Sequence, residues 1–157
     1  MEAHGFTLYE DPGLPEEEIA VRAKQFRAFM AKRRSLRFFS DKPVPASIIT
    51  DLIMTAASAP SGANKQPWFF AAVSSAELKT KIREAAEKEE YENYHGRMGE
   101  EWLQDLKKLD TNHIKPFLEI APWLIIVFKK PYDVIGGEEK KNYYVQVSAG
   151  IDDGSMI

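Results

Sequence analysis

Apolar side chains recur with a helical period near the start of this chain and gather in continuous runs further on. Residues 46–58 carry them at i, i+1, i+4, i+5, i+8 and i+9, which is the buried face of an amphipathic helix. The members of that face are Ile48, Ile49, Leu52, Ile53, Ala56 and Ala57. Residues 68–73 and 123–128 are rich in aromatic and β-branched side chains, so each predicts a buried strand.

Polar residues mark the ends of the other expected helices. Pro15 and the glutamates after it are typical of a helix start, and we expect this helix to run to Arg34, where basic side chains complement the helix dipole. Ser74 as N-cap and Glu77 after it form the sequence of a capping box, which predicts a helix beyond the first strand. A last helix is expected to begin at Tyr143.

The connecting stretches are charged or turn-forming. Residues 87–108 carry many charges and scattered aromatic side chains, which cannot build a core alone. This stretch is either a solvated helical excursion or a lid that becomes ordered over a ligand. Residues 136–141 open with a Gly-Gly pair and predict an exposed loop.

The order of these elements indicates an α+β fold. We expect residues 1–13 to be a loose N-terminal arm, residues 14–157 to be one domain, and residues 87–115 to be its lid. Two predicted strands are too few to form a stable sheet on their own. The C-terminal part of the fold is therefore expected to be missing, as in a truncated form.

Composition narrows the function classes. The net charge is −3, so the chain as a whole is no polyanion binder and no nucleic-acid partner is expected. Cysteine is absent, which excludes disulfides, thiolate nucleophiles and cysteine-ligated metals, and the 3 histidines lack ligand spacing. Without a leader or an apolar run of about 20 residues, we expect a soluble, cytoplasmic protein with no membrane partner.

Residues 33–39 hold the densest group of candidates for ligand binding. Arg33, Arg34 and Arg37 offer planar, forked donors that suit phosphate groups, and Ser35 adds a hydroxyl. This grouping at a predicted helix end indicates a site for an anionic ligand. A solvated basic helix end that only complements the dipole is the alternative.

A loop of small residues follows the second predicted helix. Residues 58–64 read Ser-Ala-Pro-Ser-Gly-Ala-Asn. Small side chains let a backbone approach a flat ligand closely. The alternative is an ordinary connection between a helix and a strand.

These stretches together resemble a known family. Arg33-Arg34-Ser35-Leu36-Arg37 is similar to the Arg-Arg-Ser-x-Arg signature of the FMN-dependent nitroreductase superfamily. Residues 59–63, followed by Gln66-Pro67-Trp68, resemble its small-residue flavin loop. The charged residues between Glu89 and Lys115 look like the lid of the iodotyrosine deiodinase subgroup. The similarity covers about residues 14–151 and implies a nitroreductase-like mixed sheet flanked by helices, with a helical active-site lid.

The resemblance also implies roles for particular residues. The cofactor FMN would be held by Arg33, Arg34, Ser35, Leu36, Arg37, Pro60, Ser61 and Gly62. The substrate would be bound by Ala63, Glu90, Tyr94 and Lys115.

Within the cofactor set, Arg33, Arg34 and Ser35 would hold the phosphate and ribityl chain. Arg37 would face the N1/O2 edge of the flavin, where a cation stabilises the reduced form. The small-residue loop would reach the flavin from the partner subunit, because sites of this family form between two protomers.

Within the substrate set, the Ala63 backbone N–H would bind a phenolate. Glu90 suits the ammonium of an amino-acid zwitterion, while Lys115 and the Tyr94 hydroxyl suit its carboxylate. Glu90 and Tyr94 are expected on one helix face. Taken alone, Glu90 and Lys115 read equally well as surface charges.

The implied reaction is FMN-dependent reductive dehalogenation of halogenated tyrosines, which releases halide and tyrosine. NADPH would supply the electrons, directly or through a flavin reductase, and the enzyme would be a homodimer. Two alternatives remain: a broader FMN nitroreductase or quinone reductase, and a non-catalytic truncated fragment that pairs with a full-length subunit. Asp152 and Asp153 depart from the family, which has small apolar residues in a buried helix there.

Overall fold

A computed structural model describes residues 8–11, 13–146 and 148–150. The chain divides into two compact units, Met1–Ser35 and Leu36–Ile157. Residues 8–11 and 13, in the predicted arm, have no regular secondary structure. The predicted domain boundary at residue 13 stays a prediction. In the described residues, no helix is both long and apolar enough to cross a membrane.

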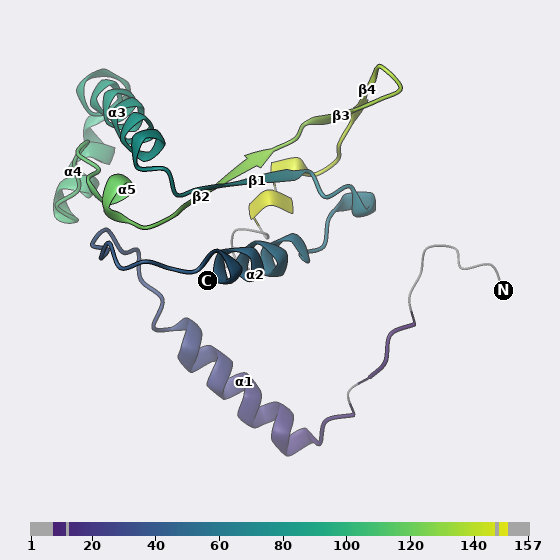
Figure 1. The fold of residues 1–157 in the computed structure, drawn as a ribbon. Helices are drawn as coiled ribbons and strands as arrows, with labels where there is room; N and C mark the ends of the chain where they lie inside the picture. Colours follow the sequence, from purple (N-terminus) through teal and green to yellow (C-terminus); the bar gives the residue numbers. More distant parts are fainter. Residues whose placement is uncertain (1–7, 12, 147, 151–157) are drawn as a thin grey trace. The chain divides into compact units, whose positions relative to one another are not determined.

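The first unit contains helix α1, Glu16–Met30 (Figure 1). Pro15 precedes it and three glutamates fill its first turn, as the sequence predicts. The predicted end at Arg34 was wrong, because the helix stops at Met30. The Arg34 guanidinium donates hydrogen bonds to the carbonyls of Ala31 and Arg33 at 2.8 and 2.7 Å. Arg34 therefore lies beyond the helix, and its side chain binds backbone carbonyls that follow the last helical residue.

The second unit is built around an antiparallel strand pair. Strand β1, Trp68–Val73, pairs with β2, Leu124–Lys129, in a register that sets Phe69 opposite Phe128. Helix α2, Ala46–Ala57, packs against β1 (Figure 1). The buried apolar side chains come from this layer and from the residue after α5: Ile49, Ala56, Trp68, Val73 and Ala121, with Pro67 fully buried. Both strands and α2 confirm the sequence predictions.

Helix α3, Ala76–Glu92, continues from β1 and leads into residues 87–115, the predicted lid, which we call the charged region. Its N-cap is Ser75, whose side chain accepts a hydrogen bond from the Leu78 N–H. The predicted capping box was therefore wrong by one residue, and Glu77 lies in the first turn without a capping role. A π-helical turn η2, Asn93–Arg97, and helix α4, Glu100–Lys108, follow.

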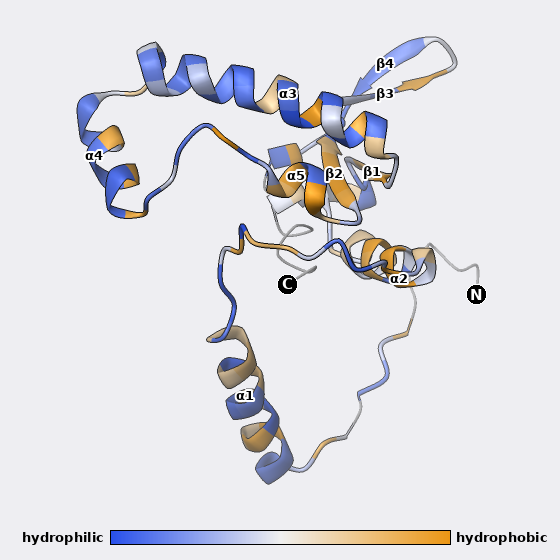
Figure 2. Cartoon of the chain, turned by 60° about the vertical axis from the view of Figure 1, so that its left-hand side comes forward, coloured by the Kyte–Doolittle hydropathy of each residue, from blue (hydrophilic) through white to orange (hydrophobic). Residues whose placement is uncertain are grey.

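The chain returns to the core through the short helix α5, Phe117–Ile120, which packs against α3. In Figure 2 the apolar residues gather on α2, α5 and β2, whereas α4 and much of α3 are hydrophilic. The charged region thus leaves the core with α3 and comes back with α5. Contacts between those two helices decide where the returning chain lies.

A second strand pair was missed by the sequence analysis. Strands β3, Tyr132–Ile135, and β4, Glu138–Lys141, form an antiparallel hairpin where the sequence predicted an exposed loop. Gly136 and Gly137 have φ of 64° and 85°, and two consecutive positive φ values define the tight turn that suits twisted strands. All four residues of β4 are exposed, so no apolar pattern marks this strand.

Helical residues follow at 145, 146 and 148–150, which places the start of the last helix at Val145 instead of Tyr143. The α+β class is confirmed. Both strand pairs in the described part of the chain are antiparallel. Asp152 and Asp153 lie outside the described residues.

Candidate functional site

The structure brings two of the predicted zwitterion-binding residues, Glu90 and Lys115, into contact. Lys115 Nζ lies 3.2 Å from Glu90 Oε2, and their side chains are 16% and 33% exposed. Tyr94 donates its hydroxyl to Thr111 Oγ1 at 3.2 Å. Glu90 lies near the end of α3 and Tyr94 in the π-helical turn after it, so the two are on consecutive helical segments. The Glu90 carboxylate and the Lys115 ammonium are thus in contact, while the Tyr94 hydroxyl is bonded to Thr111.

Lys115 is held through both its backbone and its side chain, and its carbonyl accepts the Leu118 N–H at 3.1 Å. Its backbone N–H donates to Glu87 Oε1 at 2.8 Å, and its ammonium donates to the Asn112 carbonyl at 2.7 Å besides pairing with Glu90. The residue precedes Pro116, the N-cap of α5. Because its backbone and side chain are both bound, the direction of the Lys115 side chain along α3 is determined.

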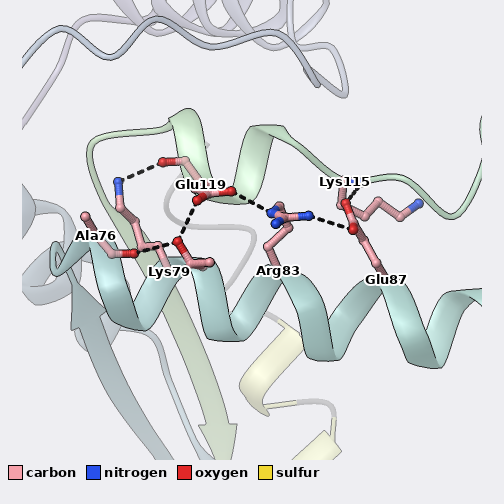
Figure 3. A network of polar contacts seen from close by, with 7 residues as sticks. Ala76, Lys79, Arg83, Glu87, Lys115 and Glu119 are labelled. Carbon is pink, nitrogen blue, oxygen red and sulfur yellow. Dashed lines mark hydrogen bonds and ion pairs between the residues drawn. The ribbon is translucent and has the colours of Figure 1, made fainter.

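Glu87 belongs to a polar network that joins α3 to α5 (Figure 3). Arg83 donates from Nη1 to Glu87 Oε2 at 2.7 Å and from Nε to Glu119 Oε2 at 2.6 Å. Thr80 donates its hydroxyl to the other Glu119 oxygen at 2.5 Å. The Thr80 hydrogen bond, then the Arg83 guanidinium, lower the pKa of Glu119. The hydrogen bond to Glu119, followed by the charge of Glu87, raises the pKa of Arg83 above its ordinary value.

Lys79 completes the contact between the two helices. It is buried, and its ammonium donates to the Glu119 carbonyl at 3.0 Å (Figure 3). The ammonium also donates to the Ala121 carbonyl at 2.6 Å. Carbonyls at the end of a helix have no partner within it, so a cation suits this place. The sequence analysis singled out none of Lys79, Arg83, Glu87 and Glu119. The i, i+4 spacing of Arg83 and Glu87 was the one available signal.

The outer part of the charged region is held by its own contacts. The Tyr91 and His95 rings stack with centroids 3.9 Å apart, and His113 meets both rings edge-on. Arg97 forms ion pairs with Glu89 and Glu92. These contacts link the end of α3 to the segment before α5.

The small-residue loop has an unusual backbone. Gly62 to Asn64 form the 3-10 turn η1, and Ala63, Asn64 and Gln66 all have positive φ, between 44° and 52°. Ser61 Oγ accepts the Gln66 N–H at 2.8 Å, which closes the loop. A Cβ on Gly62 would lie 2.9 Å from the Tyr144 ring, so a side chain at this position would require the ring to shift. Within the described residues, no acceptor is bonded to the Ala63 N–H.

The basic stretch lies across the boundary between the two units. Arg33, Arg34 and Ser35 end the first unit, whereas Leu36 and Arg37 begin the second. Arg34 uses its guanidinium on nearby carbonyls. The Arg33 and Arg37 side chains have no hydrogen-bond or ion-pair partner in the part of the chain that the structure describes. The predicted FMN-binding set is therefore not brought together within one unit.

Leu36 takes part in an apolar cavity of about 330 Å³ in the second unit. The other lining residues come from the chain after Leu36, from α2 and from the segment between α5 and β2: Phe39, Val44, Ile49, Phe117, Leu118, Ala121, Pro122, Trp123, Leu124 and Ile125. The Trp123 indole donates to the Val44 carbonyl at 2.9 Å, which joins two sides of the cavity.

Comparison with known proteins identifies the family. Residues 30–151 match the nitroreductase family. The chain belongs to this family. It is 50% identical over 153 residues to the iodotyrosine deiodinase of Haliscomenobacter hydrossis, covering 97% of this chain and 69% of that protein. It is 43% identical over 151 residues to iodotyrosine deiodinase 1 of Rattus norvegicus, covering 96% of this chain and 53% of that protein.

A solved structure supports the same fold. An oxidised iodotyrosine deiodinase bound to FMN and 3-iodo-L-tyrosine superposes with a TM-score of 0.71 at 30% identity, over 83% of this chain and 65% of that one. The nitroreductase-like fold predicted from the sequence is confirmed. The chain spans between about half and about two thirds of the length of these relatives.

Proposed function

We propose that this chain serves in the FMN-dependent reductive dehalogenation of halogenated tyrosines, with release of halide and tyrosine. The observation that carries the proposal is the pairing of Glu90 with Lys115 at 3.2 Å, with Tyr94 on the next helical turn. An amino-acid zwitterion presents one cation and one anion, and this group offers a partner to each. Membership of the nitroreductase family and the similarity to iodotyrosine deiodinases support it.

The donor set of the chain fits FMN. Arg33 and Arg37 are exposed and, among the described residues, unpaired, so they are available to a phosphate and to the electron-rich edge of a flavin. Arg34, Ser35 and Leu36 complete the stretch that would hold the phosphate and ribityl chain. Bound and reduced, FMN would supply the two electrons that, with one proton, convert the carbon–halogen bond to a carbon–hydrogen bond as halide leaves. Arg37 would stabilise negative charge near the ring.

The loop from Pro60 to Gly62 fits a flat ring on steric grounds. Gly62 lacks a side chain where its neighbours already approach closely, and Ser61 turns its hydroxyl to the Gln66 N–H. The Ala63 N–H, unbonded among the described residues, would donate to the substrate phenolate. We further propose that this loop covers the flavin of a partner subunit in a homodimer.

The charged region would then act as a lid over the substrate. Glu90 would accept the substrate ammonium, while Lys115 and Tyr94 donate to its carboxylate. Each ion of the Glu90–Lys115 pair thereby keeps an opposite charge beside it when the substrate enters. We propose NADPH as the source of electrons, acting directly or through a flavin reductase.

The test is a titration of the FMN-loaded chain with 3-iodo-L-tyrosine, followed by flavin fluorescence. We expect the purified chain to be yellow and its fluorescence to fall on addition of the ligand. A response to a nitroarene without one to iodotyrosine would instead support the broader nitroreductase or quinone reductase. A colourless chain that takes up no added FMN would support the non-catalytic fragment that pairs with a full-length subunit.

A further inference from the structure

One carboxylate binds the backbone of the returning chain to α3. Glu87 accepts the Lys115 N–H at one oxygen and the Arg83 guanidinium at the other, at 2.8 and 2.7 Å. We infer that Glu87 is a positioning residue: it fixes the backbone at Lys115 so that the Lys115 ammonium lies beside Glu90, where the amino-acid group of the substrate binds. This inference rests on the proposed function for its ligand.

The geometry gives Lys115 two attachment points on neighbouring turns of α3. Glu87 and Glu90 are three residues apart, so their side chains leave the same side of the helix. Glu87 receives the backbone of Lys115 and Glu90 receives its ammonium. Two fixed points set the direction of the side chain between them. Without Glu87, the Lys115 N–H would lose its bond to α3, and only the ammonium of Lys115 would still contact this helix, through Glu90.

The Glu87 carboxylate is itself held from both sides. Its side chain is 17% exposed and that of Arg83 is 24% exposed, so water competes less for this ion pair than on an open surface. Arg83 also binds Glu119 on α5. The guanidinium therefore ties the chain on both sides of Pro116 to one turn of α3. Charge-assisted hydrogen bonds of this kind are roughly twice as strong as neutral ones.

Glu87 and Glu90 have different roles because they have different hydrogen-bond partners. Both Glu87 oxygens are occupied by protein donors, so Glu87 is not available to a ligand. Among the described residues, the Glu90 carboxylate is paired only with the Lys115 ammonium, which also donates to the Asn112 carbonyl. When Glu90 turns to a ligand ammonium, Lys115 stays in place through Asn112 and Glu87. Glu90 thus contacts the ligand, whereas Glu87 acts only through Lys115.

The first test measures, without any ligand, how strongly the Lys115 backbone N–H is protected from exchange. In Glu87→Ala we expect amide hydrogen exchange at Lys115 to accelerate about tenfold, because the N–H loses its only acceptor among the described residues. The control is Glu84→Ala, which removes the same charge from an exposed position of α3 that accepts no hydrogen bond from a described residue. Wild-type exchange at Lys115 in Glu87→Ala would overturn the inference.

The second test separates positioning from a general loosening of the region. On the FMN-loaded chain, Glu87→Ala should weaken 3-iodo-L-tyrosine binding about tenfold and leave the affinity for 2-iodophenol unchanged, because the phenol lacks the amino-acid group. Glu87→Gln, whose amide keeps one acceptor oxygen, should recover part of the loss. Equal losses for both ligands would overturn the inference. If the wild-type chain binds no iodotyrosine, the proposed function fails, and amide exchange still decides whether Glu87 positions Lys115.

Discussion

At the scale of single residues, Glu90 and Lys115 indicate a ligand-binding role only as a pair. Each alone resembles a surface charge, but together they are a partly shielded ion pair. Such an ion pair contributes little to the stability of the fold, because ordering two long side chains costs conformational entropy. Its placement at the base of the charged region favours exchange with a zwitterionic ligand.

Glu90→Gln tests this exchange. The variant should bind 3-iodo-L-tyrosine about tenfold more weakly, because a hydrogen bond to a charged group loses much of its strength when the charge is removed. FMN affinity should not change. Flavin fluorescence titrations measure both, with Glu84→Gln as the matched variant on the same helix. An unaltered affinity for iodotyrosine would remove Glu90 from the ligand site.

At the scale of elements, the docking of α5 on α3 places the whole site. Lys79 is the buried centre of this contact, since its ammonium binds the backbone carbonyls of Glu119 and Ala121. Arg83, Thr80 and Glu119 extend the contact toward Lys115. The position of the substrate-binding lysine therefore depends on polar contacts made some distance along α3.

Lys79→Met should destabilise the fold by about 2 kcal/mol, because a side chain of similar length remains but leaves the two carbonyls without their donor. Chemical denaturation measures the free energy of unfolding. Lys81→Met changes an exposed residue of the same helix, whose ion pair among the described residues is with Glu77, and should alter this free energy by less than about 0.5 kcal/mol. Equal effects of the two substitutions would contradict the role of Lys79.

Acid should weaken the same contact through Glu119. Its pKa is lower in the folded protein, first through the Thr80 hydroxyl and then through Arg83. A lowered pKa contributes stability above the unfolded pKa of about 4.3, and this contribution is lost as the pH falls through the folded value. Glu119→Gln should therefore show a shallower fall in denaturation midpoint than the wild type below about pH 4.5. Parallel curves for the two proteins would contradict this assignment.

At the scale of the whole molecule, large apolar side chains remain exposed on described elements. Phe69 and Phe128, paired across β1 and β2, are 58% and 50% exposed, with ring centroids 6.3 Å apart. Clustered apolar exposure marks surfaces that contact other proteins. This supports the proposed homodimer, in which each flavin would lie between an arginine set from one subunit and a small-residue loop from the other.

Mixing two defective variants tests that shared site. Arg37→Ala should weaken FMN binding through the basic stretch, and Gly62→Trp should weaken it by blocking the loop. If the two elements meet across a dimer, random pairing of equal amounts restores about one quarter of the sites, because half the dimers are mixed and each mixed dimer has one intact site. FMN uptake by equilibrium dialysis measures the recovery. No recovery on mixing, from variants that each stay folded, would place both elements in one subunit.

Local patterns determined much of this protein from its sequence. The apolar period of α2 and the aromatic and β-branched runs of β1 and β2 predicted those elements, because such patterns depend only on neighbouring residues. The Arg-Arg-Ser stretch and the charged region indicated the nitroreductase family, which the comparisons confirm. The hairpin of β3 and β4 escaped notice because its exposed second strand carries no apolar pattern.

Only the tertiary structure showed which charged side chains contact distant backbone groups. Glu87 and Lys115 are 28 residues apart, and Lys79 reaches carbonyls 40 and 42 residues away. No local pattern encodes such pairs, because they form only when the chain leaves the core along α3 and returns through α5. Many acids of α3 look alike in sequence, and the returning chain distinguishes Glu87, which binds a backbone N–H, from Glu90, which stays available to a ligand.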